Sequence, residues 1–515
     1  MPGYYYQPSA TGDDELLIST TDDLGGGMND RQHPSVLSDK EAQNLQNVDL
    51  SLPGQRSRRP GRTLVEDLGA AAIGGMFNFD PQGETANLLV LENTNLKRWT
   101  GSGSFTSVSS SLTLSYPNIG FAQSYKTGVG DVALIYTGSG NVQEINGSYT
   151  LTDLGDTNTS PPKTPIMAGY RNRVWSLKSD LLYFSSAAPS DYSTAFDRTT
   201  NNFRIPCGEE RALIPTRDQG LIILGKSQVW AINPSTTPAA TDKPEFISNY
   251  GCAAGKTAVI LGDDIYYFSF DGVRGIKRTE QDKLQYGTSK PVSYRLKSNF
   301  ETINWAQITK ACAVFWDNKY FLALPVSGST YNNQVWVYWP SSDSWVVLTG
   351  WNVAAWSVFK LNGEERLYYG EASADGDVFR AWSGASDSGT AISWIEESRS
   401  DNLKQPSIRK IGSELEVVAK PSGNYNITVE GAFDNGSYNS LGTVNVSSGL
   451  ITFPVTYPVA FTPDSEIREK FHLDSYGPFY TFAYKLSHNA VTTNADDITI
   501  YKTQLTAIPE KYESE

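Results

Sequence analysis

Histidine and cysteine, the side chains that most often carry nucleophilic and metal chemistry in enzymes, are scarce in this chain of 515 residues. Zinc sites, Ser-His-Asp triads and facial iron triads need at least one well-placed histidine. No cysteine pair or Cys/His spacing suits a metal here. The residues of these two types are His33, His472, His488, Cys207, Cys252 and Cys312. We therefore expect no catalytic centre, no metal and no cofactor, and the odd cysteine count favours a reducing folding compartment.

A glycine-rich segment, Gly251-Cys-Ala-Ala-Gly-Lys-Thr257, resembles a phosphate-binding P-loop in composition. A P-loop needs four residues between its glycines, so that successive N–H groups curl around a phosphate, and a helix after them. Here three residues separate the glycines, and the β-branched segment 258–261 is strand-like. The sequence predicts a loop that enters a strand.

Two carboxylates, Asp375 and Asp377, flank Gly376 in a segment similar to the Asp-box turn of sialidases. The glycine is one position too early, no second copy is present, and no glutamate completes a calcium loop. We interpret the segment as a solvated hairpin turn.

Five tryptophans lie within 21 residues, and such a cluster forms either a sugar-stacking platform or, more commonly, packing within and between sheets. They are Trp336, Trp339, Trp345, Trp351 and Trp356.

Four arginines, Arg56, Arg58, Arg59 and Arg62, form the one dense basic patch. They could contact phosphate. The chain carries a net charge of −14, however, and its pI near 4.9 argues against retention on nucleic acid or an anionic membrane surface. We favour these arginines as subunit-interface candidates that dock on an acidic face of a neighbouring copy.

Seven short apolar strands recur at intervals of 42 to 55 residues, and each is followed by turn residues and an amphipathic partner strand. They are 88–91, 132–136, 174–177, 221–224, 265–268, 320–324 and 367–369. Hairpins at this spacing predict an all-β fold, a β-propeller of six to eight blades over residues 66–390. An extended array of β-sandwiches is the alternative.

The flanking segments differ in composition from the repeat. Residues 1–24 are polar and glycine-rich, which predicts a flexible N-terminal arm without a secretory signal. Within 25–65, Ser38 and Glu41 form a capping box for a short helix over 39–47, and an extended basic segment for subunit docking follows. Residues 391–515 predict a separate β-sandwich-like domain, with strands at 415–419, 426–430, 450–453, 482–486 and 498–501. No apolar stretch is long enough to span a bilayer, so we expect no membrane insertion.

Several short segments between Gly25 and Trp351 resemble one family. They are Gly26–Asn29 with Pro34, the helix expected at 39–47, Asn47–Leu50, Arg58–Gly61, Asp264–Arg274, Ala311–Pro325, Val335–Tyr338 and Trp345. In these segments the chain resembles the tail nozzle and packaged-DNA stabilisation proteins of short-tailed bacteriophages. The last third matches only in its β character, and the resemblance implies no catalytic residues.

The resemblance implies a structural virion protein in the phage tail, assembled in the bacterial host cytoplasm. Such subunits form a ring, typically a hexamer, that docks below the adaptor and portal, retains packaged DNA and forms the channel for its ejection; tail fibres are further partners. An acidic lumen would let genomic DNA pass without tight binding. Two alternatives stay open: a host-surface adhesin that binds glycans through the tryptophan-rich stretch and the terminal sandwich, and a propeller glycoside hydrolase that uses Asp375 and Asp377.

Overall fold

The computed structural model divides the chain into two compact units, which we describe separately. Unit 1 combines Met1–Arg59 with Ser393–Glu515, and unit 2 is Pro60–Ile392. The structure describes residues 16–217, 220–278, 284–286, 290–423, 425–446, 466–492 and 498–510.

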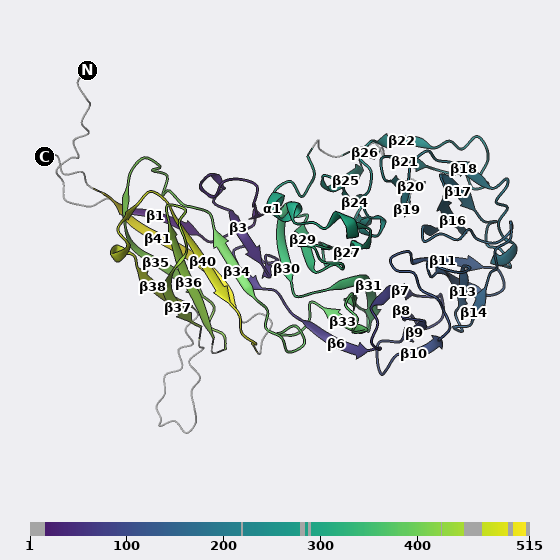
Figure 1. Ribbon diagram of the computed structural model, residues 1–515, viewed down its shortest axis with the longest axis horizontal. Coiled ribbons are helices and arrows are strands. Elements are labelled where there is room, and N and C mark those ends of the chain that lie inside the picture. The colour runs from purple at the N-terminus through teal and green to yellow at the C-terminus, as the bar shows by residue number, and fades with distance from the viewer. Residues whose placement is uncertain are drawn as a thin grey trace, which may run out of the picture. The chain divides into compact units, whose positions relative to one another are not determined.

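Unit 2 is a β-propeller built from seven consecutive sets of four antiparallel strands (Figure 1). In blades one to six the strands follow chain order from the inside outwards. Blade one consists of β7 (Ile73–Phe79), β8 (Asn87–Glu92), β9 (Asn95–Trp99) and β10 (Thr106–Ser109). Blade two consists of β11 (Gly120–Lys126), β12 (Gly130–Tyr136), β13 (Gln143–Asn146) and β14 (Leu151–Asp153). Blade three consists of β15 (Met167–Tyr170), β16 (Arg173–Lys178), β17 (Leu181–Phe184) and β18 (Asn202–Arg204). Blade four consists of β19 (Glu210–Thr216), β20 (Gly220–Gly225), β21 (Val229–Ile232) and β22 (Glu245–Ser248). Blade five consists of β23 (Val259–Leu261), β24 (Asp264–Ser269), β25 (Gly272–Arg278) and β26 (Leu284–Tyr286). Blade six consists of β27 (Cys312–Trp316), β28 (Lys319–Leu324), β29 (Gln334–Trp339) and β30 (Ser344–Thr349).

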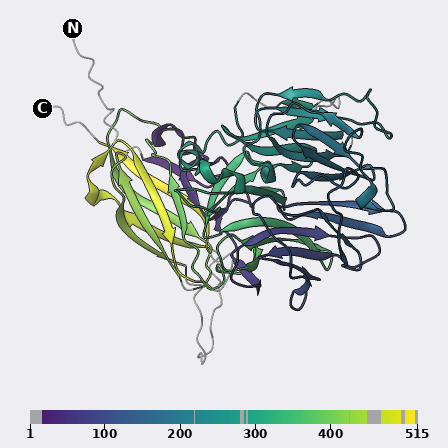
Figure 2. The same ribbon diagram turned by 45° about the vertical axis from the view of Figure 1, so that its right-hand side comes forward.

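The seventh blade closes the ring. Its first three strands are β31 (Val353–Leu361), β32 (Glu364–Glu371) and β33 (Asp377–Ala381), and its fourth is β6 (Arg62–Asp67), from the opposite end of the unit. The first strands β7, β11, β15 and β19 contact one another in turn, as do β23, β27 and β31, and β31 contacts β7. Figure 2 shows the same blades turned by 45°. The short helices of unit 2 are η2 (Tyr192–Thr194), η3 (Gly255–Thr257), α1 (Lys297–Glu301) and η4 (Trp305–Lys310).

Each of the seven predicted apolar strands falls on the second strand of a blade, and each predicted partner falls on the third. A second strand has neighbours on both edges and side chains buried on both faces; every residue of β8, β20 and β28 is buried. Burial on both faces requires a continuous apolar run, which makes the period visible in the sequence. The propeller is thereby confirmed.

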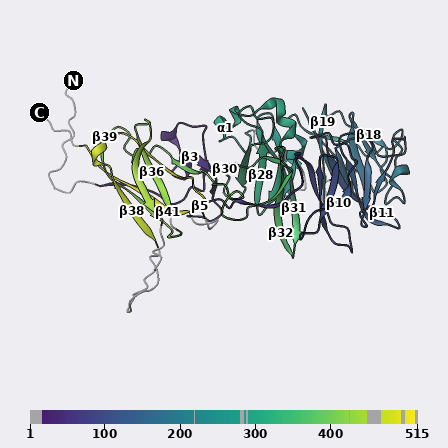
Figure 3. The ribbon, with the colours of Figure 1, turned by 60° about the horizontal axis from the view of Figure 1, so that its bottom comes forward.

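Unit 1 is a sandwich of two sheets (Figure 3). One sheet has the order β38 (Ile467–His472), β35 (Lys410–Ala419), β41 (Thr499–Pro509), β5 (Arg56–Arg58) and β4 (Val48–Asp49), with β1 (Leu17–Thr21) paired to β41 and β39 (Pro478–Phe479) paired to β35. The other contains β2 (Gly27–Met28), β3 (Glu41–Gln46), β34 (Trp394–Ser398), β40 (Phe482–His488), β36 (Asn426–Phe433) and β37 (Asn439–Asn445). The sheets meet where Phe479 of the first packs on Phe433 of the second, with ring centroids 5.4 Å apart. The short helices are η1 (Pro34–Val36) and η5 (Asp474–Tyr476).

The predicted C-terminal sandwich is therefore present, but it also contains five strands from the N-terminal segment. In the expected arm, Leu17–Thr21 forms β1 and pairs in register with β41, so that part is an ordered strand; residues 1–15 lie outside the described residues. The strand expected at 450–453 also lies outside them.

The helix expected at 39–47 is wrong, because Glu41–Gln46 forms strand β3. The turn before it carries the capping-box bond, since Ser38 N donates to Glu41 Oε2 at 3.0 Å. A β-bulge between Ala42 and Asn44 then inserts one residue. Ala42 and Leu45 are both fully buried, and the bulge gives them the spacing of three that a helix would produce.

Glycines allow the first strands of neighbouring blades to approach closely. A Cβ at Gly169 in β15 would lie 2.0 Å from the carbonyl oxygen of Gln123 in β11. Because a backbone atom blocks that position, the two blades would have to separate to admit a side chain.

We expect Gly169→Ala to lower the free energy of unfolding by about 1–3 kcal/mol through this overpacking. Gly147→Ala is the control, since its Cβ would meet the flexible Glu84 side chain at 3.3 Å and Pro81 Cβ at 4.0 Å, with no backbone atom that close. Urea denaturation of both variants measures the difference, and equal midpoints would contradict the close approach of the blades.

Candidate functional site

Three of the four arginines proposed for subunit docking are buried within unit 1. Arg56 Nε lies 3.1 Å from Glu396 Oε2, and both side chains are fully buried. Arg56 Nη1 also donates to Thr21 O at 2.8 Å. The acidic partner that we expected on a neighbouring copy is thus Glu396 of the same chain, and it joins the two sheets of the sandwich.

Arg58 and Arg59 extend this internal network. Arg58 donates to the hydroxyl of Thr492, and Arg59 Nε donates to Asn47 Oδ1 at 2.8 Å. Asn47 has a left-handed backbone with φ 57°, and its Nδ2 donates to Ser393 O at 2.7 Å. These bonds tie the N-terminal segment of unit 1 to its C-terminal segment.

Arg62 lies in the closing strand of the propeller. Its Nη1 is 3.0 Å from Glu371 Oε2, and its guanidinium lies 4.0 Å from the ring centroid of Phe379. The docking prediction is therefore corrected: Arg56, Arg58 and Arg59 have no surface for a second copy to reach, and Arg62 is mostly covered by its own blade. Arg56 and Arg62 of this basic cluster pair with Glu396 and Glu371 of the same chain.

The tryptophan cluster is core, which decides against the sugar-stacking platform. All five of its members are less than 10% exposed. Trp351 stacks on Tyr369 with centroids 5.7 Å apart, and its Nε1 donates to Asp387 Oδ1 at 2.9 Å.

Asp375 and Asp377 lie at the turn between β32 and β33, as the hairpin interpretation predicted. Burial, with Asp67 and Asp375 nearby, raises the pKa of Asp377. Among the described residues no group of three or more His, Cys, Asp or Glu side chains could hold a metal ion.

The P-loop-like segment forms η3 and leads into β23, so the prediction of a loop entering a strand is confirmed. A Cβ at Gly255 would lie 1.9 Å from Arg211 O, and one at Gly251 would lie 2.0 Å from Lys226 O. Both glycines therefore serve close packing of the loop on blade four, and Lys256 is held beside Arg211.

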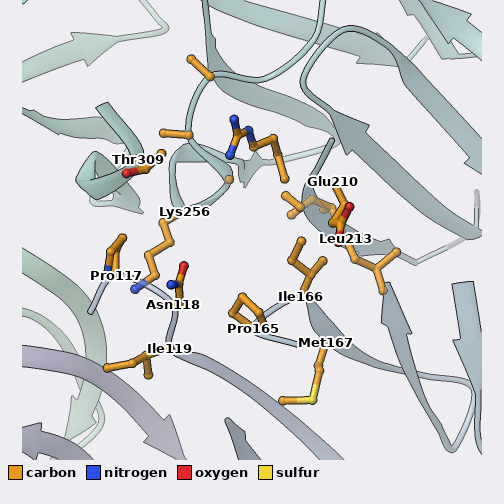
Figure 4. A pocket seen from close by; sticks show the side chains of 16 residues that line it. Pro117, Asn118, Ile119, Pro165, Ile166, Met167, Glu210, Leu213, Lys256 and Thr309 are labelled. Carbon is orange, nitrogen blue, oxygen red and sulfur yellow. The ribbon is translucent and has the colours of Figure 1, made fainter. Parts of the chain in front are cut away.

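Lys256 borders a cavity at one end of the ring of first strands (Figure 4). The cavity encloses about 240 Å³. Its walls come from the segments that begin blades two to six, and their polar side chains are Asn118, Glu210, Arg211, Lys256 and Thr309. Figure 4 shows Lys256 and Asn118 on one side of the cavity and Glu210 on the other.

The Lys256 ammonium has no carboxylate within ion-pair distance in the described part of the chain. Its Nζ lies 5.5 Å from the centroid of the Tyr116 ring. Burial without a counter-ion lowers the pKa of Lys256 to about 8. Burial also raises the pKa of the nearby Cys312 thiol to about 12, so this cysteine is protonated and unreactive at neutral pH.

Glu210 and Lys256 border the cavity from different blades. Glu210 Oε1 accepts a hydrogen bond from Ser179 N at 3.1 Å, on a different wall from Lys256. Sequence reasoning singled out Lys256 only inside a rejected motif and missed Arg211 and Asn118 entirely. These three residues come from three blades, and only folding brings them together.

No protein-family model matches the chain. No curated protein matches it. Solved structures that the chain matches include virginiamycin B lyase from Staphylococcus aureus, at 8% identity and a TM-score of 0.41, over 62% of this chain and 98% of that one. BBS1N in complex with ARL6DN matches at 12% identity and a TM-score of 0.37, over 62% of this chain and 96% of that one.

PorZ, a surface component of the type-IX secretion system of Porphyromonas gingivalis, matches over 87% of this chain and 60% of its own, at 12% identity and a TM-score of 0.38. Such distant likenesses carry no conclusion about activity or partners. Within the described ranges, no helix has the length and apolar character needed to cross a membrane.

Removing one partner of the Arg56–Glu396 pair leaves an unpaired buried charge. We expect Arg56→Met and Glu396→Leu each to destabilise the protein by about 3–5 kcal/mol, and the double variant Arg56→Met/Glu396→Leu to recover much of that loss. Arg366→Met, which breaks the exposed Arg366–Glu364 pair, is the control and should change stability by less than about 1 kcal/mol. Additive losses in the double variant would show that the two residues do not act as a pair.

The pKa of Lys256 predicts a specific dependence of stability on pH. The folded state, with a pKa of about 8, releases this proton before the unfolded state, whose lysine pKa is about 10.4. The unfolded state thus binds more protons between these values, so wild type should gain up to about 3 kcal/mol relative to Lys256→Met as pH rises from 7 to 10. Denaturation of both proteins across this range tests it; a stability difference independent of pH would contradict the burial of the ammonium.

Proposed function

We propose that this protein is a non-catalytic subunit of the tail nozzle of a short-tailed bacteriophage, which retains packaged DNA and forms part of the channel for its ejection. The main structural support is that strands from the N-terminal segment pair with strands far along the sequence, β1 with β41 in unit 1 and β6 with β33 in unit 2. The N-terminal segment contributes Arg56 to the interior of unit 1 and, a few residues later, β6 to the last blade of the propeller. A protein that must hold its shape under internal pressure benefits from such closure, because no blade can peel away from a free edge.

The segments that carry the family resemblance occupy structural positions. Asp264–Arg274 forms most of the β24–β25 hairpin, in which Tyr267 and Phe268 are fully buried. In β28, Tyr320 is buried and its hydroxyl donates to Thr257 O at 2.8 Å. The likeness therefore lies in residues that fix turns and blade packing, which supports a shared architecture.

Charge gives independent support. The net charge of −14 on 515 residues makes retention of DNA by phosphate neutralisation unfavourable. A ring built from such subunits would repel the DNA backbone and let it slide. The adhesin alternative loses its proposed platform, because the five clustered tryptophans are buried.

We expect the purified protein, alone or with its adaptor, to form rings of six copies. Such a ring repeats one heterologous contact around an axis. Six chains of 56.5 kDa give it a mass of about 340 kDa. Size-exclusion chromatography with light scattering measures this mass, and mass spectrometry of purified phage particles tests for the chain in virions. A monomer at all concentrations that is absent from particles would overturn the proposal.

A further inference from the structure

The cavity on the propeller axis presents several hydrogen-bond donors that have no acceptor in the described part of the chain. The Lys256 ammonium lies 5.5 Å from the centroid of the Tyr116 ring and has no carboxylate within ion-pair distance in the described part of the chain. Arg211 Nε is buried without a hydrogen-bond partner, although its Nη2 lies 2.8 Å from Glu209 Oε1 at the surface. A buried donor without a partner is energetically unfavourable, and more so when it is charged. Such a cost is offset when a ligand supplies the missing acceptors.

The fold fixes these donors relative to one another. Gly255 brings η3 into contact with the backbone of Arg211, so Lys256 and Arg211 cannot separate without disrupting the first strand of blade four. Asn118 comes from the segment before β11 and lines the same cavity as Lys256 (Figure 4). Residues from three blades therefore line one cavity on backbone that the fold holds in place, and such preorganisation lowers the cost of ligand binding.

We propose that this cavity binds a small oxyanion, a phosphate or carboxylate group, through Lys256, Arg211 and Asn118. A volume of about 240 Å³ lies below the range of about 300–1,000 Å³ typical of drug-sized ligands, so the ligand is small. Arg211 is ion-paired with Glu209, which leaves Lys256 as the cavity cation without a carboxylate within ion-pair distance in the described part of the chain, and its charge favours an anion. The guanidinium and the amide supply directed donors to the oxygen atoms of the anion.

Binding depends on the charge of Lys256. The groups around it are Tyr116 on the segment before β11, Arg211 and Glu210 on β19, Lys310 at the end of η4 and Cys312 on β27. Tyr116 and Cys312 have pKa values raised by burial and stay neutral across the useful range. Lys256 is therefore the group around the cavity that loses charge near pH 8, and an anion held by it should bind less tightly as pH rises through that value.

Isothermal titration calorimetry of the full-length protein tests the proposal, with sodium phosphate and sodium malonate as probes at constant ionic strength. At pH 7 at least one probe should bind saturably, and Lys256→Met should weaken it by about tenfold or more, since a hydrogen bond to a charged group contributes about 1.5–3 kcal/mol. Lys360→Met replaces an exposed lysine of β31 and should leave the affinity unchanged. Affinity for wild type should also fall between pH 7 and 9.5.

A second readout does not depend on a variant. Reductive methylation followed by peptide mass spectrometry should label Lys256 more slowly when the bound probe is present, while Lys360 is labelled at the same rate. Saturation by phosphate alone, by malonate alone or by both supports the proposal and identifies the class of anion. The absence of saturable binding by either probe, or equal affinity in wild type and Lys256→Met, overturns it.

Discussion

The propeller depends on one constraint: a ring of blades must close, and here the closing strand comes from far away in the sequence. β6 pairs with β33 across more than 300 residues, from Arg62 opposite Ala381 to Asp67 opposite Asp377. Arg62 reinforces this pairing through Glu371 and the ring of Phe379. Without β6 the last blade would lack its outer strand, and the open edge would expose unpaired backbone groups to other chains.

The same N-terminal segment also completes unit 1, and it does so through buried charge. A buried ion pair is no simple source of stability, because desolvation opposes the Coulomb attraction. The pair instead favours one arrangement of the strands over others. Arg56 reaches Glu396 only when β5 is in register with β41 and the two sheets pack against each other. Lys256 is the contrasting case, a cation beside the propeller axis with no carboxylate against it in the described part of the chain, and for that reason we assign a ligand to the axial cavity and none to the arginine cluster.

The sequence predicted the propeller because burial on both faces makes each second strand a continuous apolar run. It failed at residues 39–47, where the bulge in β3 gives Ala42 and Leu45 a helix-like spacing. It also failed for Arg56, Arg58 and Arg59, because a local pattern of charge does not reveal a carboxylate 340 residues away at Glu396. The cavity could not be predicted from the sequence for the same reason. Its walls come from five blades, and each blade contributes only a few of the lining residues. The apolar runs in the sequence predict the strands within a blade. A site between blades depends on which residues the closed ring of blades brings together, and the apolar runs do not show that.

The most direct test of this account measures how firmly the N-terminal strand closes the ring. In native-state hydrogen exchange, the backbone amides of β6 that pair with β33 should exchange as slowly as those of β32, because all three strands open only when the propeller unfolds. Exchange of β6 within seconds, while β32 stays protected, would mean that the ring persists without its N-terminal strand and would contradict the account.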